Sequence, residues 1–233
     1  MRGMDATALS NNIAKLRQRV RLSAEKSQRK ECDIRIMAAS KTRDSNAVKA
    51  AWELGLRDFG ENYVQEALTK IEALRDCDIC WHFIGPIQSN KTRAIAENFD
   101  WVHSVEREKI ARRLSEQRPS GMPPLKICLQ VNISGEDSKS GVGLTQLPGL
   151  AESIADLPNL VLRGLMAIPA ASEDPEVQHS AFRQLAEALA SLQATAPDMD
   201  TLSMGMSGDL EAAIAKGATI VRVGTDIFGP RAG

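Results

Sequence analysis

Short apolar runs alternate with stretches of helical periodicity along almost the whole chain, and this alternation limits the possible folds more than any other feature. Each run is short enough to be one strand, and each except the last is followed by a helical segment. Successive runs start roughly 20 to 40 residues apart, which is the spacing of one strand–helix unit. The predicted strands are 34–39, 57–60, 81–85, 101–105, 125–131, 160–168, 201–204 and 219–223.

The predicted helices show apolar residues three and four positions apart. The first precedes all strands and covers 5–30, with Leu9, Ile13, Leu16 and Val20 on one face. The others are 45–54, 63–74, 91–98, 107–117, 145–155, 175–194 and 209–216. Basic residues fill the opposite side of the first helix, and we expect a solvated face there, formed by Lys15, Arg17, Arg19, Arg21 and Lys26.

Strands that alternate with helices form a parallel sheet. Eight units in 233 residues favour a closed (β/α)₈ barrel near the lower size limit of that fold, with an extra N-terminal helix. The alternative is an open doubly wound sheet, whose nucleotide-binding form carries a glycine-rich turn after its first strand. Here that turn is 40–43 and contains no glycine. We therefore expect one barrel domain over 1–233.

Composition excludes several classes of protein. The 29 basic and 30 acidic residues nearly cancel, and aromatic residues are only 4%, so no nucleic-acid partner is expected. No stretch without a charged residue exceeds 12 residues, the length of 140–151, and a membrane span needs ~20 apolar residues. The N-terminus lacks the apolar centre of a signal peptide. We expect a cytoplasmic protein without membrane contact, and a monomer.

The four cysteines do not form a recognisable metal or redox motif. Cys77 and Cys80 make one C-x-x-C pair with His82 nearby, but no second pair supplies further ligands. The pair also precedes an apolar run, whereas a thioredoxin-type motif follows a strand. Packed or loop cysteines are therefore expected. We interpret His82 and His103, which lie within predicted strands, as core residues with satisfied hydrogen bonds.

Polar residues follow several predicted strands, where a barrel places its functional groups. Lys41 follows the first strand, and Glu61 and Asn62 end the second. Barrel closure brings the eighth strand beside the first, so Arg222 should lie near Lys41. An inward arginine is costly unless it is paired or bound to a ligand. The alternative for Arg222 is a structural salt bridge with an acidic residue on a neighbouring strand.

The loops after the seventh and eighth strands are the usual phosphate site of such barrels. Here they are 203–208 and 224–225, rich in glycine, serine and threonine, and the first leads into a predicted helix near Asp209. Alone, each segment is no more than a helix cap. Together with Lys41 and Arg222 they indicate a site for an aldehyde-bearing phosphate. Two candidates follow: pyridoxal 5′-phosphate (PLP) held as a Schiff base on Lys41, or a sugar phosphate handled by a Schiff-base aldolase.

Eight segments of the chain resemble the YggS/PROSC family of PLP-binding proteins, and they occur in the order of that family. The most specific are WHFIGPIQSNK at 81–91 and LSMGMS at 202–207. The others are AASKT at 38–42, FGENY at 59–63, QVNIS at 130–134, KSG at 139–141, RGLM at 163–166 and VRVGTDIFG at 221–229. The resemblance covers nearly the whole chain.

The resemblance implies a barrel similar to the PLP-binding domain of alanine racemase, with PLP bound covalently to Lys41. It also implies that Arg222 faces the pyridine nitrogen and that Asn62 contacts the ring or its hydroxyl. Ser203, Gly224 and Thr225 would hold the phosphate. One departure is Gly208, which stands where the family commonly has an acidic residue. Family members are regarded as cofactor carriers in PLP and amino-acid homeostasis, so apo PLP-dependent enzymes are possible recipients.

Arg222 also favours binding over catalysis. An arginine donates and stays charged, so it leaves the pyridine nitrogen unprotonated and the ring a weak electron sink. Racemisation additionally needs a second base, which racemases take from a tyrosine of a second domain. The chain ends eight residues after Thr225, so no second domain is expected, and Tyr63 is its only tyrosine. We expect a PLP carrier or reservoir rather than an enzyme, with a racemase-like activity as the alternative.

Lys139 is a further candidate. It lies in a loop rich in glycine, serine and acidic residues, at 134–143. One hypothesis is that Lys139 contacts the phosphate or accepts PLP transiently as the cofactor leaves. The alternative is a solvated loop lysine with no role in binding.

Overall fold

The eight predicted strands form a closed, all-parallel barrel in the order β1 to β8. The structure is a computed structural model and describes residues 6–136 and 139–230. Because the barrel is closed, the open doubly wound alternative is wrong. The strands are β1 (Arg35–Ala39), β2 (Asp58–Glu61), β3 (Cys80–Phe83), β4 (Trp101–Val105), β5 (Leu125–Gln130), β6 (Leu160–Met166), β7 (Thr201–Ser203) and β8 (Ile220–Val223).

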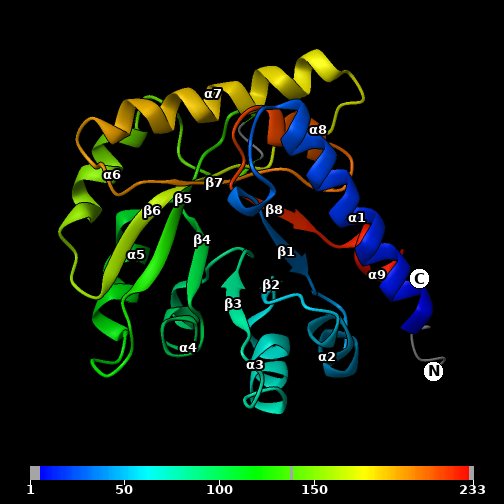
Figure 1. Ribbon diagram of the computed structural model, residues 1–233. Helices are drawn as coiled ribbons and strands as arrows, with labels where there is room; N and C mark the ends of the chain where they lie inside the picture. Colours follow the sequence, from blue (N-terminus) through cyan, green and yellow to red (C-terminus); the bar gives the residue numbers. More distant parts are fainter. Residues whose placement is uncertain (1–5, 137–138, 231–233) are drawn as a thin grey trace.

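The helices lie outside the strands and complete the (β/α)₈ pattern (Figure 1). They are α1 (Ala6–Lys26), α2 (Ser45–Glu53), α3 (Val64–Ala73), α4 (Thr92–Asn98), α5 (Glu108–Gln117), α6 (Leu147–Ala155), α7 (Pro175–Gln193), α8 (Leu210–Ala215) and α9 (Thr225–Phe228). Short 3₁₀ turns at Glu31–Asp33 and Ser89–Lys91 precede β1 and α4. Residue 5, the predicted start of the first helix, is outside the described residues.

The four-residue helix α9 is not predicted by the sequence. It follows Gly224 and contains two buried residues, Ile227 and Phe228. Its brevity explains the omission, because four residues cannot display a helical periodicity. The consequence is that Thr225 begins a turn of helix beside the end of β8, where the sequence predicts only a loop.

Closure of the barrel sets the relative positions of the polar residues at the strand ends. β1 pairs with both β2 and β8, and Met37 lies opposite Arg222 in the β1–β8 register. The β6–β7 pair requires a glycine, since a Cβ on Gly164 would lie 1.9 Å from the carbonyl oxygen of Thr201. Because all eight strands are parallel, their carboxyl ends meet at one end of the barrel.

Helix α1 covers the outside of the barrel beside α8 and α9, as the blue and red ribbons of Figure 1 show. The predicted apolar face is buried, with Leu9, Ile13, Leu16 and Val20 almost inaccessible to solvent. The opposite face is only partly the solvated face expected from the sequence. Arg19 pairs there with Glu211 of α8 and with Asp226 of α9.

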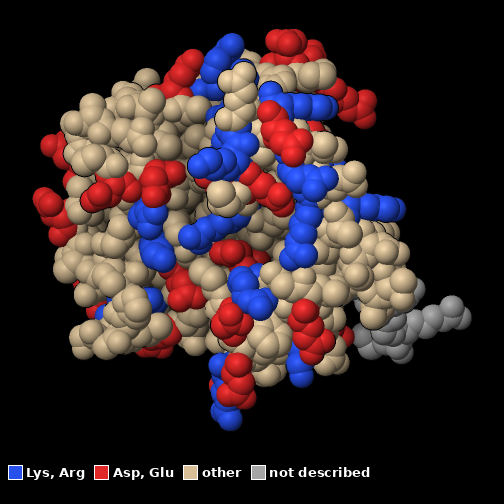
Figure 2. Space-filling view, viewed as in Figure 1, with Lys and Arg blue, Asp and Glu red and all other residues tan. Residues whose placement is uncertain are grey.

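The face of the molecule shown in Figure 2 carries Lys and Arg side chains interspersed with Asp and Glu. No continuous basic stripe, of the kind that follows a nucleic-acid backbone, runs across that face. In the part of the chain that the structure describes, none of the helices has both the length and the apolar character needed to cross a bilayer.

Candidate functional site

A cavity of about 280 Å³ opens at the carboxyl ends of the strands. Five of the six residues predicted to bind the cofactor line it: Lys41, Asn62, Arg222, Gly224 and Thr225. They come from the ends of β1, β2 and β8, which barrel closure makes neighbours. The other lining residues are Ala39, Thr42, Arg43, Ile84, Ile168, Met206, Ser207, Gly208 and Gly229.

Arg222 extends from β8 into the barrel and is almost completely buried. Its Nη2 atom donates to the carbonyl oxygen of Ala167 at 2.8 Å, and its Nη1 atom donates to the Oγ atom and the carbonyl oxygen of Ser203. Within the described residues no carboxylate forms an ion pair with it, so the salt bridge considered from the sequence is not observed. Burial lowers the pKa of Arg222 to about 10, and the guanidinium is still a cation at neutral pH.

Ser203 is the one predicted phosphate ligand that does not line the cavity. Its side chain is fully buried, and its Oγ atom lies 2.9 Å from Nη1 of Arg222 and 2.8 Å from Nδ1 of His103. The hydroxyl group is therefore engaged inside the barrel, where it supports Arg222. Ser207, four residues further along the same loop, lines the cavity instead.

The loop after β7 is shaped by Asp209. Its Oδ1 atom accepts a hydrogen bond from the backbone N–H of Met206 at 2.6 Å, and α8 begins at the next residue. Burial raises the pKa of the Asp209 carboxyl group, while the Met206 N–H and the charge on Arg222 oppose this effect. Across the cavity, a Cβ on Gly224 would lie 3.2 Å from the carbonyl oxygen of Ala39. Glycine therefore lets β8 end close against β1.

A buried ion pair between Lys70 and Glu61 supports the turn that carries Lys41. Nζ of Lys70 donates to the carbonyl oxygen of Ser40 at 2.8 Å and to the Oε1 atom of Glu61 at 2.8 Å. Ser40 also donates its hydroxyl to Glu61 at 2.6 Å. Glu61 is fully buried and absent from the cavity lining, so its carboxylate supports the turn. Burial raises the pKa of Glu61 against the opposing effect of Lys70.

Asn62 contributes an unpaired polar atom to the cavity wall. Its Oδ1 atom is buried and has no hydrogen-bond partner within the described structure. A buried carbonyl oxygen without a partner is costly, and such atoms in native proteins commonly await a water molecule or a ligand. Asn62 thus offers an acceptor, and a neighbouring NH₂ donor, to whatever occupies the cavity.

Two other candidates lie away from the cavity. Tyr63 is 57% exposed and does not belong to the lining. Lys139 places its Nζ atom 3.1 Å from Oε1 of Glu136 and is also outside the lining. Residues 137–138 of the predicted loop are outside the described residues. This arrangement gives Lys139 a local ion pair and no contact with the cavity.

Six lining residues are not predicted from the sequence: Ala39, Thr42, Arg43, Ile84, Ile168 and Gly229. Arg43 closes one side of the cavity and donates to the carbonyl oxygens of Gly229 and Pro230, which ties the β1 turn to the end of α9. Ile84 and Ile168 supply apolar walls. Predicting them requires knowing which way each side chain points, and the sequence alone does not give that. The only available signal is their place just after β1, β3 and β6.

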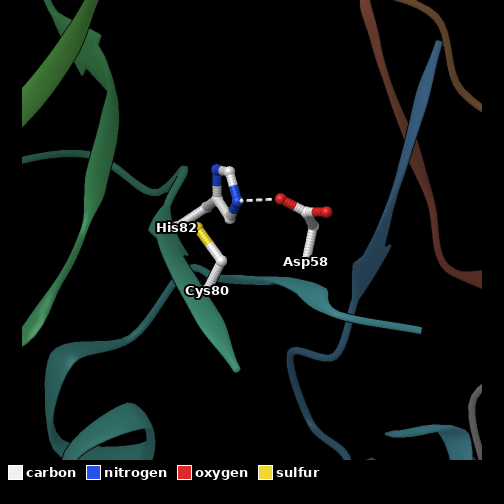
Figure 3. A group of neighbouring side chains, drawn as sticks. All are labelled: Asp58, Cys80 and His82. Atoms are coloured by element: carbon white, nitrogen blue, oxygen red, sulfur yellow. Dashed lines mark hydrogen bonds and ion pairs between the residues drawn. The ribbon is translucent and has the colours of Figure 1, made fainter. Parts of the chain in front are cut away.

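A second group of polar side chains lies within the barrel, away from the Lys41 turn. Figure 3 shows Asp58 of β2 facing His82, which neighbours Cys80 on β3. Nε2 of His82 lies 2.9 Å from Oδ1 of Asp58. Burial raises the pKa of the Cys80 thiol to about 12, and Nη1 of Arg35 lies 3.5 Å from Asp58. A protonated thiol and an adjacent cation disfavour a metal ion at this position.

The fold and the cavity define a class of protein: a (β/α)₈ barrel with a lysine and a buried arginine facing one cavity. The family described as "Alanine racemase, N-terminal domain" matches residues 4–232. A "Pyridoxal phosphate homeostasis protein" of Pseudomonas aeruginosa is 57% identical over 97% of this chain and 96% of its own length. A protein of the same name from Escherichia coli K12 is 48% identical over 96% and 97%. The chain belongs to this family of pyridoxal phosphate homeostasis proteins, as its sequence motifs indicate.

Solved structures agree. PipY of Synechococcus elongatus, determined with PLP bound, superposes with a TM-score of 0.83 at 36% identity, over 95% of this chain and all of PipY. A protein from Bifidobacterium adolescentis gives a TM-score of 0.91 at 34% identity, over 96% of this chain and 95% of that chain. Alanine racemase of Corynebacterium glutamicum, at 18% identity and a TM-score of 0.66, shares the barrel fold over 98% of this chain and 62% of its own.

Proposed function

We propose that the protein binds PLP in the cavity at the carboxyl end of the barrel, as a Schiff base on Lys41, and serves as an intracellular carrier or reservoir of the cofactor. The observation that carries the proposal is the meeting of Lys41, Arg222 and the unpaired Oδ1 of Asn62 in one cavity. The names of the relatives and the PLP-bound structure of PipY support the same ligand.

The residues present fit the chemical groups of PLP. Lys41 supplies the amine that condenses with an aldehyde. Ser207 and Thr225 supply hydroxyl donors for the phosphate, and Gly208 and Gly224 leave room for it. Ser203 remains a support for Arg222 in this assignment. When bound, PLP withdraws electrons from an attached amine through its ring.

Arg222 and Asn62 would set the orientation of the ring. Arg222 is held by the carbonyl oxygen of Ala167 and by Ser203, so its guanidinium can present a fixed donor toward the ring nitrogen. An arginine cannot accept a proton from the pyridinium, and its charge disfavours one. Asn62 would contact the ring hydroxyl group. Ile84 and Ile168 would contact the faces of the ring.

The cavity lacks the groups that catalysis would need. Among its described lining residues, the only charged groups are Lys41, Arg43 and Arg222, with no carboxylate, histidine, tyrosine or cysteine. Racemisation requires a second base, and an aldolase requires an acid to shuttle protons. Tyr63 is exposed and Glu61 is fully buried, and neither side chain lines the cavity. A carrier therefore fits the site better than the racemase-like and aldolase alternatives.

The experiment is to add PLP to the purified protein and record absorption spectra beside those of Lys41→Ala. We expect a protein-dependent band that borohydride removes and that the variant lacks. The loaded protein is then incubated with L- and D-amino acids. Unchanged enantiomers and no keto acid support a carrier, while turnover that needs Lys41 supports the racemase-like alternative. The absence of a band in the wild type contradicts PLP binding.

A further inference from the structure

Five buried or half-buried side chains form a continuous hydrogen-bonded chain through the interior of the barrel. It starts at Arg222 and passes through Ser203, His103 and His82 to Asp58, whose side chain is 18% exposed. The successive distances are 2.9, 2.8, 2.9 and 2.9 Å. The residues belong to β8, β7, β4, β3 and β2, so the chain crosses the interior and connects Asp58 with the cavity wall.

The direction of every hydrogen bond follows by elimination from the two ends. An ionised carboxylate only accepts, so Nε2 of His82 donates to Asp58. A neutral His82 then accepts at Nδ1, and the donor is Nε2–H of His103. Nδ1 of His103 accepts in turn from the Ser203 hydroxyl, whose oxygen accepts from Arg222. All four bonds therefore point from the guanidinium toward the carboxylate.

Both histidines must be neutral for this arrangement, and their surroundings favour it. Burial lowers the pKa of His82, although Asp58 and Asp100 oppose the effect. Burial lowers the pKa of His103 well below its usual value, and the charge of Arg222 acts in the same direction. Each ring is completely buried, and Trp101 lies against His82 with ring centroids 5.7 Å apart.

We propose that Asp58, His82, His103 and Ser203 are positioning residues that hold Arg222 as a fixed donor at the cavity, with Asp58 setting the direction of the whole chain from its far end. This inference rests on the proposed function in one respect, because it takes Arg222 to contact PLP. Arg222 has no carboxylate partner of its own among the described residues, and aligned hydrogen bonds polarise one another. Asp58 is thus the terminal acceptor of the chain, while Asp209 is the carboxylate whose charge acts on Arg222.

Other charged or titratable groups surround the chain and have to be considered in any pH titration. Arg35 of β1 pairs with Asp58, and Asp100 precedes β4. Asp209 acts on Arg222 from the loop after β7. Further groups face the same interior from β3, β5 and β6: Cys80, Lys126, Cys128 and Arg163.

The first test needs no cofactor. Nitrogen-15 NMR of the histidine rings in PLP-free protein at neutral pH should show Nε2–H and unprotonated Nδ1 for both His82 and His103. The amide introduced by Asp58→Asn can donate as well as accept, so the variant no longer fixes the direction of the hydrogen bonds in the chain. We expect this variant to change the tautomer of His103, which does not contact residue 58. A protonated Nδ1 on His103 in the wild type, or a His103 signal indifferent to Asp58→Asn, overturns the inference.

The second test asks whether the chain reaches PLP. The pH midpoint of the absorption band of bound PLP is compared in the wild type, His103→Phe, His82→Phe and Asp58→Asn. Each variant leaves the Arg222 charge in place but frees the guanidinium to move relative to the Schiff base, so the midpoint should shift by about half a pH unit or more in each variant. Asp58→Asn is nearly isosteric, which keeps the test valid if a histidine variant fails to fold.

The control is Val102→Ala, a buried residue on the same strand as His103 and outside the chain. It should lower thermal stability and leave the midpoint unchanged. Equal midpoints in the wild type and Asp58→Asn, or a shift in Val102→Ala as large as in His103→Phe, contradict the proposed positioning role. Failure of the wild type to bind PLP refutes the proposed function instead, and the NMR test still decides whether the chain exists.

Discussion

Thr42, beside the proposed Schiff-base lysine, has a backbone conformation that its side chain disfavours. Its φ angle is +66°, in the left-handed region where a β-branched residue is an outlier. Such strain persists when surrounding contacts determine the backbone, and it clusters at functional sites. Here the Thr42 N–H donates to Oε1 of Glu66 at 2.7 Å, while Nζ of Lys70 binds both Glu66 and the carbonyl oxygen of Ser40. The buried Lys70 thus holds both sides of Lys41.

Replacing Lys70 by methionine tests this role. The variant leaves the fully buried Glu61 carboxylate without its cation, and we expect the free energy of unfolding to fall by about 3–5 kcal/mol. Urea denaturation measures the loss. The double variant Glu61→Gln with Lys70→Met removes both charges and should recover a large part of it. A Lys70→Met protein as stable as the wild type would show that the pair does not hold the turn.

Most residues of the candidate site can be predicted from the sequence. Lys41, Asn62, Arg222, Gly224 and Thr225 were identifiable because the ends of parallel strands converge, whatever the rotamers. The choice between Ser203 and Ser207 depends on which way each side chain points, and the spacing in LSMGMS does not encode that direction. The role of Lys70 was also hidden, since a lysine in the middle of a predicted helix looks like a solvated residue.

At the scale of elements, α1 braces the loops around the cavity. The Arg19 guanidinium forms two bonds with Glu211 of α8, at 2.9 and 3.0 Å, and pairs with Asp226 of α9. It also donates to the carbonyl oxygen of Ser207 at 3.1 Å. The N-terminal helix therefore fixes the loop after β7 and the helix after β8 relative to each other, and both supply lining residues.

Arg19→Met should weaken PLP binding without unfolding the barrel. Each half-exposed ion pair is worth only about 0.2–1 kcal/mol, so we expect the dissociation constant to rise roughly three- to tenfold. Fluorescence titration with PLP provides the measurement. Arg21→Met is the matched control, because Arg21 lies on the same helix and, among the described residues, forms an ion pair with Glu25 alone, at 3.9 Å. Equal affinities of the two variants would exclude a bracing role for α1.

At the scale of the whole molecule, periodicity and connectivity determined the fold. Eight strand–helix units leave a barrel as the arrangement that pairs every strand edge, and closure follows without knowledge of any side chain. The interior polar chain could not be predicted in the same way. His82 and His103 are core residues with satisfied hydrogen bonds, as the sequence predicts. Their other partners, Asp58 and Ser203, come from two further strands, and only the strand register brings these residues together.

The buried histidines should make stability depend on pH. Their pKa values are lowered in the folded state, so below about pH 6.5 the unfolded chain binds protons that the folded chain does not. A histidine whose folded-state pKa is far below its usual value, such as His103, then removes at most about 1.4 kcal/mol of unfolding free energy per pH unit as the pH falls. Urea denaturation from pH 7.5 to 5 should show this decline. This slope fades only about one pH unit above 6.5, where the unfolded chain no longer binds these protons.

His103→Phe isolates the histidine contribution. Glu61 and Asp209 have raised pKa values and act in the opposite sense, because the folded state then retains protons. Their effect is common to both proteins and cancels in the comparison. Between pH 6.5 and 5 the variant should lose slope, by an amount that rises toward a limit of about 1.4 kcal/mol per pH unit as the pH falls. Identical slopes would mean that His103 is protonated in the folded protein.

Peptide mapping can locate the proposed Schiff base between PLP and Lys41 at the mouth of the barrel. The loaded protein is reduced with borohydride, digested and analysed by mass spectrometry. We expect a pyridoxyl adduct on the peptide that contains Lys41, at close to one per chain, and none on the corresponding peptide of Lys41→Ala. A wild-type adduct located mainly on Lys139 or on another lysine, with Lys41 unmodified, would contradict the proposed Schiff base.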